Sequence, residues 1–298
     1  MNAPLPVFLL GPTGIGKSDL AAEIAHACGG EIVGADAFQI YRGLDLLTAK
    51  PEPATLARAP HHLIGEIPLT EHFDVAKYAA LADARIAGIQ ARGRLPIVVG
   101  GTGLYIRALT HGLAKLPAAD ATLRAELEAQ PPADLLRRFT ALDPIGAAQI
   151  DTRNPRRIVR ALEVCLLTGR PFSSFREQWA QPRFALRGVL LARERADLCA
   201  RIDARTDAMF AAGVVEEVGA ISAIGDTAAQ ALGFREICRL IAGEITQPEC
   251  VQRLQQATRN YAKRQLTWFR RETAFHILPI AAGENATHLA DTARALLV

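Results

Sequence analysis

The chain has 298 residues, of which 50% are hydrophobic and 22% are charged. This balance is typical of a globular protein with a sizeable core and excludes a disordered chain. The net charge is only +3, so the sum of charges indicates no nucleic-acid partner, and the distribution of charge matters more.

Strands and helices alternate in the first third of the chain. Strands are predicted at 6–10, 31–35 and 95–99, and helices at 17–27 and 75–91. The proline-rich stretch 51–60 is expected to be a loop with short helical turns. This alternation favours a parallel sheet that is covered by helices.

From about residue 113 the pattern becomes helical, with prolines between short segments. Helices are predicted at 121–130, 133–142 and 154–168, and strand character returns only at 184–191 and 275–278. We therefore predict an α/β fold: a parallel sheet core with helices on both faces and an inserted helical subdomain. The motif G-x-x-x-x-G-K-[ST] at 11–18, between the first strand and the first helix, makes this core P-loop NTPase-like. The expected boundaries are 1–112 and 184–298 for the two parts of the core and 113–183 for the insertion.

No apolar run approaches the roughly 20 residues of a membrane span, so no membrane segment is expected. The N-terminus leads directly into the first predicted strand, so we expect no signal peptide. The five cysteines are scattered, without a C-x-x-C pair. They are typical of reduced thiols in a cytoplasmic protein, not of a disulfide framework or a zinc site. The histidines are isolated or adjacent and favour structural or partner-binding roles over metal binding.

A phosphate-binding loop follows the first predicted strand. Its sequence fits G-x-x-x-x-G-K-[ST] and consists of Gly11, Pro12, Thr13, Gly14, Ile15, Gly16, Lys17 and Ser18. The glycines let backbone N–H groups point at phosphate oxygens, and the following helix N-terminus favours an anion. Lys17 supplies a charge and Ser18 a hydroxyl for Mg²⁺. The loop predicts a site for a diphosphate or a triphosphate.

Two further strand ends carry candidate site residues, because ligands of open α/β sheets bind at the carboxyl ends of the strands. The strand at 95–99 ends in Gly100–Gly103 and not in an acid, which counts against nucleotide hydrolysis. This turn either approaches a substrate or only connects a strand to a helix. Asp36 ends the strand at 31–35, where it is a Mg²⁺ ligand, a general base or a cap.

Basic residues gather in two places. The first set shares one face of a predicted helix and consists of Arg153, Arg156, Arg157 and Arg160. The opposite face, expected to pack inward, carries Ile158, Leu162, Cys165 and Leu166. The second set consists of Arg259, Lys263, Arg264, Arg270 and Arg271, with Tyr261, Trp268 and Phe269 among them. The arginine face fits phosphate-backbone contacts or a solvated surface, and the aromatic rings either stack on unpaired bases or, as we favour, belong to the core.

Arg201 and Arg205 lie one helical turn apart after the returning strand. This position brings an arginine over the phosphate loop, where it would stabilise a charged leaving group. The alternative is a surface ion pair with Asp197 or Asp203.

Taken together, these motifs resemble those of the tRNA dimethylallyltransferases over nearly the whole chain. The matching segments are 11–18, 35–43 (Ala-Asp-Ala-Phe-Gln-Ile-Tyr-Arg-Gly), 48–51 (Thr-Ala-Lys-Pro), 61–64 (His-His-Leu-Ile), 99–105 (Val-Gly-Gly-Thr-Gly-Leu-Tyr), 160–164, 232–235 (Leu-Gly-Phe-Arg) and 262–268. The zinc-finger extension of some eukaryotic members has no counterpart, so the expected relatives are bacterial.

The resemblance implies transfer of a dimethylallyl group from dimethylallyl diphosphate to the N6 amine of the adenosine 3′-adjacent to the anticodon. The expected tRNAs read codons that begin with U. The phosphate loop would then hold the diphosphate of the donor with Mg²⁺, which accounts for the missing strand-end acid. The implied partners are the tRNA anticodon stem-loop and dimethylallyl diphosphate, without a membrane, and the protein is expected to act as a cytoplasmic monomer.

The resemblance also assigns roles to residues. Asp36 matches the base for the adenine amine, Thr102 a residue near the reacting diphosphate, and Arg205 one that stabilises it. Positions that match tRNA contacts are Asp36, Ala37, Phe38, Gln39, Gly103, Arg156, Arg157, Ile158, Val159, Arg160, Gln230, Gly233, Arg235, Lys263, Arg264, Trp268 and Arg270.

The chain departs from the family pattern at three positions. Ala37 stands where Ser is usual, Leu47 where Gly is common, and Gly65 where Asp is frequent. None of them removes a proposed catalytic group. Two alternatives remain open at this point: a P-loop kinase for a small molecule or nucleotide, and a tRNA-binding protein that uses a nucleotide as a switch.

Overall fold

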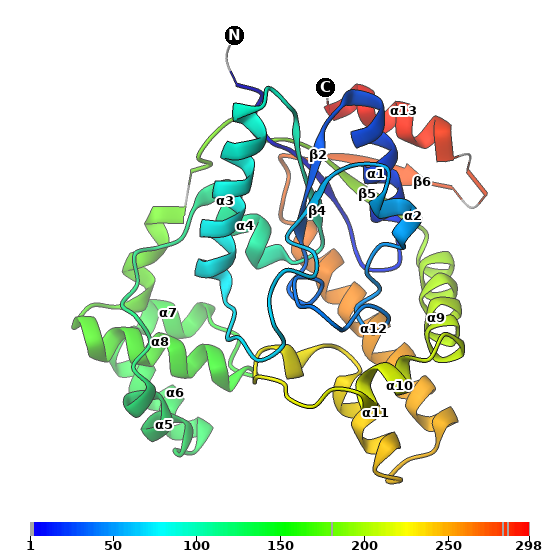
Figure 1. Ribbon diagram of the computed structural model, residues 1–298. Coiled ribbons are helices and arrows are strands. Elements are labelled where there is room, and N and C mark those ends of the chain that lie inside the picture. The colour runs from blue at the N-terminus through cyan, green and yellow to red at the C-terminus, as the bar shows by residue number, and fades with distance from the viewer. Residues whose placement is uncertain (1–2, 180, 282, 285, 298) are drawn as a thin grey trace. The chain divides into compact units, whose positions relative to one another are not determined.

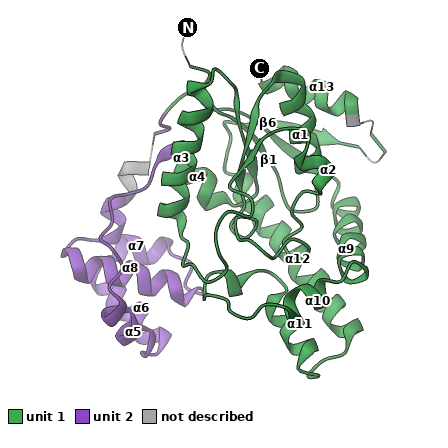
Figure 2. Ribbon diagram, viewed as in Figure 1, with its two compact units in different colours: residues 1–110, 184–298 green, residues 111–183 purple. Residues whose placement is uncertain are grey.

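The computed structural model describes residues 3–179, 181–281, 283–284 and 286–297. Residues 1–110 and 184–298 form one compact unit, and residues 111–183 form a second one (Figure 2). The chain leaves the first unit and later returns to it, so the second unit is an insertion. Within the described residues, no helix is long and apolar enough to cross a bilayer.

The first unit is built on a six-stranded sheet in which every pair of neighbouring strands is parallel. The strands are β1 (Val7–Leu10), β2 (Glu31–Ala35), β3 (His61–His62), β4 (Pro96–Gly100), β5 (Arg187–Arg193) and β6 (His276–Ile280). Their order across the sheet is β3-β2-β4-β1-β5-β6. The predicted α/β fold with a parallel sheet is confirmed, although β5 and β6 begin later than predicted.

Helices cover both faces of this sheet (Figure 1). The helices of the first unit are α1 (Lys17–Cys28), α2 (Pro53–Leu56), α3 (Val75–Ala91), α4 (Gly103–His111), α9 (Arg195–Ala211), α10 (Val214–Gly219), α11 (Phe234–Ile241), α12 (Gln247–Phe269) and α13 (Ala286–Leu297), with a 3₁₀ turn η2 (Ala228–Gln230). In β1, Val7 and Leu9 pack with α1 and α13, whereas Phe8 and Leu10 pack with α3 and α4. The period of two in a strand therefore divides the core between the two faces.

A third hydrophobic cluster in the same unit joins a loop to the later helices. Leu44 and Leu47 are buried together with Val214 and Val218 of α10 and Ile237 of α11. Leu47, one of the departures from the family pattern, is therefore a core residue. This cluster holds the loop that follows Asp36 against α10 and α11.

The second unit consists of helices around its own core. Its elements are α5 (Ala121–Glu128), α6 (Pro132–Leu142), α7 (Pro144–Gln149), α8 (Pro155–Thr168) and a 3₁₀ helix η1 (Phe172–Trp179). Phe139 of α6 packs with Ile158, Leu162 and Cys165 of α8. Leu166 was expected to face this core, but its side chain is exposed because it lies in the last turn of α8, beyond the buried stretch.

The predicted set contains no range for the helices after β5 and no helix at α4 or α7, where glycines weaken the helix signal. Gly103 opens α4, where a Cβ would lie 2.3 Å from a ring atom of Trp268. In α7, a Cβ on Gly146 would lie 2.2 Å from the carboxylate of Asp143. These helices use glycine because a neighbouring side chain occupies the space of the Cβ.

The amino-terminal end of β2 is tied to its neighbours by a buried carboxylate. Glu31 is 2% exposed, and its Oε2 lies 2.7 Å from Nε2 of His62 in β3 and 2.7 Å from Nη2 of Arg92. Arg94 contributes a contact of 3.3 Å to Oε1. The hydrogen bond from Arg92 lowers the pKa of Glu31 to about 2, against its partial desolvation. The structural interpretation of the histidine pair thus holds for His62.

We expect Glu31→Gln to lower the free energy of unfolding at neutral pH by about 1–3 kcal/mol, since it weakens a buried ion pair whose arginines are half-exposed. The pKa of Glu31 is depressed in the folded state, so this stabilisation is present above its ordinary pKa of 4.5 and is lost as the pH falls toward 2. Denaturant unfolding of both proteins across this range is the measurement. The exposed Glu216→Gln is the control, and a difference that stays constant down to the lowest pH would contradict the assignment.

Candidate active site

The phosphate loop connects β1 to α1, as its motif requires. Gly14 and Gly16 have φ values of 82° and 98°, a left-handed conformation that favours glycine. Nζ of Lys17 donates a hydrogen bond of 2.8 Å to the carbonyl of Pro12, so the side chain folds back over the loop. Burial lowers the pKa of Lys17 to about 8, with a further decrease from Arg205, while Asp36 opposes the shift. The free loop therefore holds a poorly solvated cation that an anion would stabilise.

A buried glutamine braces this loop from α12. The Oε1 atom of Gln265 accepts a hydrogen bond of 2.9 Å from the N–H of Thr13, and its Nε2 donates one of 2.9 Å to the carbonyl of Gly101. Gln265 is 5% exposed. It joins the turn after β1 to the turn after β4, and the candidate set from the sequence does not contain it. The sequence signal that could have identified Gln265 is a polar residue on the buried face of α12, the face that also carries Ala262 and Phe269.

Two arginines of α9 reach the same loop. Nη2 of Arg205 donates to Oγ1 of Thr13 over 2.9 Å, and Nε of Arg201 donates to the carbonyl of Gly14 over 3.1 Å. The Nε of Arg205 is buried and has no hydrogen-bond partner among the residues that the structure describes, and burial lowers the pKa of this guanidinium. An unsatisfied donor beside a cavity fits an anionic ligand.

The alternative ion pairs for these arginines are wrong. Asp197 pairs with Arg193 at 2.5 Å, and Asp203 pairs with Arg259. Arg259 is thereby neutralised within the first unit and drops out of the second basic set. Arg201 and Arg205 remain directed at the phosphate loop.

Asp36 lies at the carboxyl end of β2 and starts a turn. Its Oδ1 accepts hydrogen bonds from the N–H groups of Phe38 (2.9 Å) and Gln39 (3.2 Å), so the capping interpretation holds for this oxygen. Its Oδ2 has no hydrogen-bond partner within the described part of the chain. One oxygen thus fixes the carboxylate while the other remains available to a proton or a cation.

Thr102 connects the turn after β4 to this aspartate. Its Oγ1 accepts a hydrogen bond of 3.1 Å from the N–H of Ala37, and its own N–H donates to the carbonyl of Ala35 over 3.2 Å. The contact to Thr102 comes from the backbone N–H of residue 37 and not from its side chain. The contact therefore does not depend on whether this residue is Ala or Ser. These two hydrogen bonds, to the residues on either side of Asp36, fix the position of Thr102 relative to Asp36.

The glycine turn after β4 is needed for close packing. A Cβ on Gly100 would lie 2.2 Å from the carbonyl oxygen of Ala35, and one on Gly101 would lie 2.3 Å from Nε2 of Gln265. The connector interpretation therefore accounts for these glycines, and Thr102 carries the polar group of the turn.

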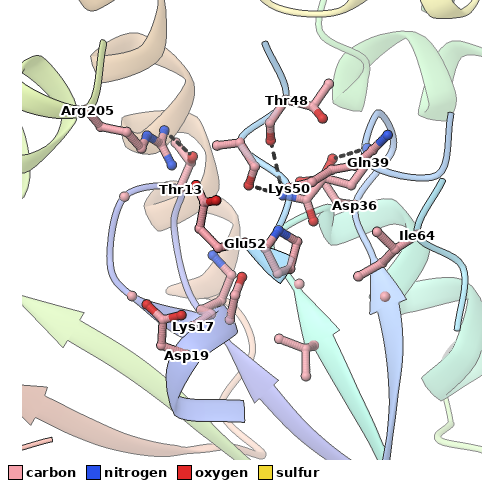
Figure 3. Close-up of a pocket in the computed structure, with 18 of the residues that line it drawn as sticks. Thr13, Lys17, Asp19, Asp36, Gln39, Thr48, Lys50, Glu52, Ile64 and Arg205 are labelled. Carbon is pink, nitrogen blue, oxygen red and sulfur yellow. Dashed lines mark hydrogen bonds between the residues drawn. The ribbon is translucent and has the colours of Figure 1, made fainter. Parts of the chain in front are cut away.

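Two cavities of the first unit open above these strand ends. The larger one, of about 400 Å³, is lined by Thr13, Lys17, Ser18, Asp36, Gln39, Thr48, Lys50, Glu52, Arg201 and Arg205, among others (Figure 3). The smaller one, of about 260 Å³, is lined by Phe38, Leu47, Gln230, Leu254, Tyr261 and Arg264, among others. Both are bounded by Thr13, Asp36, Thr48, Ala49 and Arg205, so they adjoin at the carboxylate.

The remaining candidates of the first unit are arranged around the smaller cavity or on the surface. Lys263, Arg235 and Arg270 are exposed, Trp268 is half-buried against Gly103, and Phe269 is buried, as the core interpretation predicts. Gly233 is buried and has a φ of 91°. Its contribution is therefore a left-handed backbone conformation that favours glycine. The amide of Gln39 donates to the carbonyls of Thr48 (3.1 Å) and Ala49 (2.9 Å), which leaves its oxygen as the group that is able to contact RNA.

The basic helix of the second unit divides into two parts. Arg156 and Arg157 are exposed on α8. Arg160 is half-buried, pairs with the buried Glu163 at 2.6 Å, and donates to the carbonyl of Pro117. Ile158 and Val159 are 1% and 3% exposed, so their assignment as tRNA contacts is wrong for the side chains, which pack in the core of the unit.

The site offers oxygen donors but no complete metal cage. Among the residues that the structure describes, no three His, Cys, Asp or Glu side chains are arranged to hold a metal ion. Ser18 in the first turn of α1 and Asp36 both line the larger cavity. A hard cation here would need further oxygen ligands from a bound phosphate, which is the usual manner of Mg²⁺ binding.

Comparison with known proteins gives a consistent result. The family model described as IPP transferase matches residues 39–272. The tRNA dimethylallyltransferase of Halorhodospira halophila is 48% identical over 285 residues, which cover 92% of each chain. That of Geobacter sulfurreducens is 45% identical over 278 residues, covering 90% of this chain and 89% of the relative.

Solved structures agree with these relatives. The full-length tRNA isopentenylpyrophosphate transferase of Bacillus halodurans superposes with a TM-score of 0.73 at 33% identity and covers 99% of this chain and 97% of that one. A eukaryotic dimethylallyltransferase acting on tRNA gives a TM-score of 0.79 at 25% identity, with 92% and 73% covered. On the strength of the sequence match, which spans most of the chain, this protein belongs to the IPP transferase family.

Proposed function

We propose that this protein transfers the dimethylallyl group of dimethylallyl diphosphate to the N6 amine of the adenosine 3′-adjacent to the anticodon. The tRNAs would be those that read codons beginning with U, and the products N6-dimethylallyladenosine and diphosphate. One observation carries the proposal: a phosphate-binding cavity and a second cavity with aromatic and amide groups meet at Asp36 and Arg205. The relatives of the chain are named for this transfer.

The larger cavity suits the diphosphate of the donor. The backbone of the phosphate loop, Lys17 and the unsatisfied Nε of Arg205 provide positive charge and N–H donors on one side. Both cations are poorly solvated, so a dianionic group gains more from them than it would in water. The hydroxyl of Ser18, together with diphosphate oxygens, would hold Mg²⁺, which would neutralise charge on the leaving group when bound.

The smaller cavity suits a nucleobase. Phe38 and Tyr261 provide aromatic rings, while Gln230 and Arg264 provide polar groups at its wall. Burial raises the pKa of Tyr261 to about 12, so its hydroxyl stays protonated and remains a donor. A base in an anticodon loop must leave its stack to enter such a cavity, and aromatic walls compensate for the lost stacking.

The chemistry follows from the place where the cavities adjoin. The amine lone pair of the adenine attacks the allylic carbon C1, the bond from C1 to the diphosphate oxygen breaks, and the amine gives up one proton. Asp36 receives this proton at Oδ2, since Oδ1 is engaged by the turn. Lys17 and Arg205 stabilise the charge that develops on the leaving diphosphate.

The tRNA surface is proposed to include exposed basic residues of both units. In the second unit these are Arg156 and Arg157, and in the first unit Lys263, Arg264 and Arg270. Their charges suit phosphate contacts, which position an RNA without reading its sequence. A cytoplasmic location and a monomeric state are further parts of the proposal.

The kinase alternative is not favoured. A kinase of this loop type carries an acid for Mg²⁺ at the end of a second apolar strand, and β4 ends instead in glycines followed by Thr102. Relatives over about nine-tenths of the chain carry the name of a tRNA prenyltransferase.

The direct test is incubation of the protein with Mg²⁺, unmodified tRNA and dimethylallyl diphosphate, followed by nucleoside digestion and mass spectrometry. A prenylated adenosine adjacent to the anticodon is the expected product. A parallel reaction with ATP in place of the donor measures hydrolysis and phosphoryl transfer. ATP consumption without prenylated nucleoside would move the protein to the kinase or switch class.

Asp36→Asn is expected to reduce kcat by about 10²- to 10⁴-fold, because the amide keeps the acceptor oxygen of the turn but is not a base. Asp36→Ala removes both functions, so a comparison of the two variants separates the base from the turn. The dissociation constant for tRNA, measured by filter binding, should change little in Asp36→Asn. A near-normal kcat in that variant would exclude the proposed base.

The affinity for the diphosphate group is expected to fall as the pH rises through about 8. The free protein loses the Lys17 proton there, whereas a bound diphosphate favours the charged form. Above that pH the affinity should fall by up to about tenfold per pH unit, and below it Lys17 should contribute no pH dependence. Calorimetry with inorganic diphosphate measures this, and Lys17→Arg serves to subtract the ionisation of the ligand. The same pH dependence in both proteins would show that Lys17 does not titrate there.

Arg157→Ala is expected to weaken tRNA binding and to reduce the slope of log K against log salt by about one, as the loss of one phosphate contact predicts. Binding titrations at several salt concentrations give the slope. Arg294→Ala, which removes a charge from α13, is the control and should leave the slope unchanged. Equal slopes for Arg157→Ala and wild type would place α8 outside the RNA surface.

A further inference from the structure

One loop forms part of the wall of both cavities. We call residues 44–50 the cavity strap. Thr48 and Ala49 line both cavities, Leu46 and Lys50 line the larger one, and Leu47 lines the smaller one. The strap therefore borders the place where the donor and the base would meet, together with Asp36 and Arg205, which line both cavities as well.

The side chains of Gln39 and Lys50 hold the conformation of the cavity strap by hydrogen bonds. The amide of Gln39 holds the carbonyls of Thr48 and Ala49, and Nζ of Lys50 donates to Oδ1 of Asp45 over 2.6 Å and to the carbonyl of Tyr41. Ala49 has a φ of 50°, a left-handed conformation that is unfavourable for a residue with a Cβ. The conformation of the strap thus depends on such ties.

A third tie comes from a different helix. Glu217 of α10 accepts a hydrogen bond of 2.9 Å from the N–H of Leu46 at Oε1 and another of 2.9 Å from the N–H of Leu47 at Oε2. One carboxylate satisfies two consecutive backbone N–H groups. A charged acceptor that receives two N–H donors makes stronger contacts than a neutral one. Glu217 lines neither of the two cavities described above.

The packing around Glu217 connects this tie to the proposed RNA-contacting residues. Val214 and Val218 of α10 share a buried cluster with Leu44 and Leu47 of the strap. The same cluster includes Ala231 and Ile237, which flank the segment that carries Gly233 and Arg235. Strap, α10 and α11 therefore form one packed body.

We propose that Glu217 is a positioning residue for the prenyl transfer. It holds the cavity strap so that Thr48 and Ala49 keep the shared wall in place beside Asp36 and Arg205, and it acts without touching either substrate. This inference rests on the proposed function of the two cavities. Loss of the tie lets the wall relax away from the reacting groups, and misplacement of a supporting wall by about 1 Å lowers the rate by up to about 10²-fold.

The test compares Glu217→Ala and Glu217→Gln with Glu216→Ala, which removes the neighbouring exposed carboxylate. We expect kcat to fall by about tenfold or more in Glu217→Ala, with KM for tRNA changed by less than about threefold. Glu217→Gln should be intermediate, because its amide oxygen accepts one N–H while its NH₂ group faces the other. A loss of folded protein alone would also lower the apparent kcat at constant KM, so the active fraction of each variant is measured by stoichiometric binding of inorganic diphosphate and kcat is given per active site.

Hydrogen exchange gives a second readout that does not depend on activity. The amides of residues 44–50 should exchange faster in both Glu217 variants than in wild type or Glu216→Ala. Faster exchange with an unchanged kcat would overturn the positioning role, and unchanged exchange would overturn the tie itself. If wild-type protein makes no prenylated tRNA while the exchange still responds to Glu217, the proposed function fails and the tie stands.

Discussion

Two poorly solvated cations, Lys17 and Arg205, line one cavity. Removing their charges from water is unfavourable, and the rest of the site is arranged around these two groups. Burial lowers the pKa values of Lys17 and Arg205; the positive charge of Arg205 lowers the pKa of Lys17 further, and that of Arg201 lowers the pKa of Arg205. Asp36 counters the shift of both groups. Such an arrangement is unfavourable without a ligand and becomes favourable when an anion occupies the cavity.

The fold makes this arrangement possible because parallel strands bring their carboxyl ends to one edge of the sheet. The turn after β1 is the phosphate loop, the turn after β2 begins with Asp36, and the turn after β4 carries Thr102. The fourth contribution follows β5, where α9 begins and later presents Arg205. Four segments far apart in the chain thus supply one site, which agrees with the general position of ligands in open α/β sheets.

Hydrogen bonds from neutral polar side chains hold these segments in fixed positions relative to one another. Gln265 joins the turns after β1 and β4, Thr102 joins the turn after β4 to the Asp36 turn through the N–H of Ala37, and Gln39 joins the Asp36 turn to the cavity strap. None of these groups adds net charge beside Lys17 and Arg205. Because such a wall is already in position, the reaction does not need the rearrangement of surrounding dipoles that it would need in water.

The sequence by itself determined the features that depend on contiguous residues. The phosphate loop, the strand end at Asp36 and the helical character of the insertion follow from local patterns of glycine, apolar residues and proline. The family resemblance correctly led to Arg205 at the loop. These features are readable because backbone conformation depends mainly on neighbouring residues.

The tertiary structure alone decided which side chains meet. Gln265 contacts Thr13 across 252 positions, and Glu217 contacts Leu46 across 171. Local spacing correctly placed Ile158 on the inward face of its helix, whereas the family resemblance put Ile158 and Val159 among the tRNA contacts, and both side chains are buried in the core of the second unit. Only the folded chain shows that one oxygen of Asp36 is engaged while the other is available. Contacts between distant residues depend on how whole elements pack, and no local pattern in a single sequence records that packing.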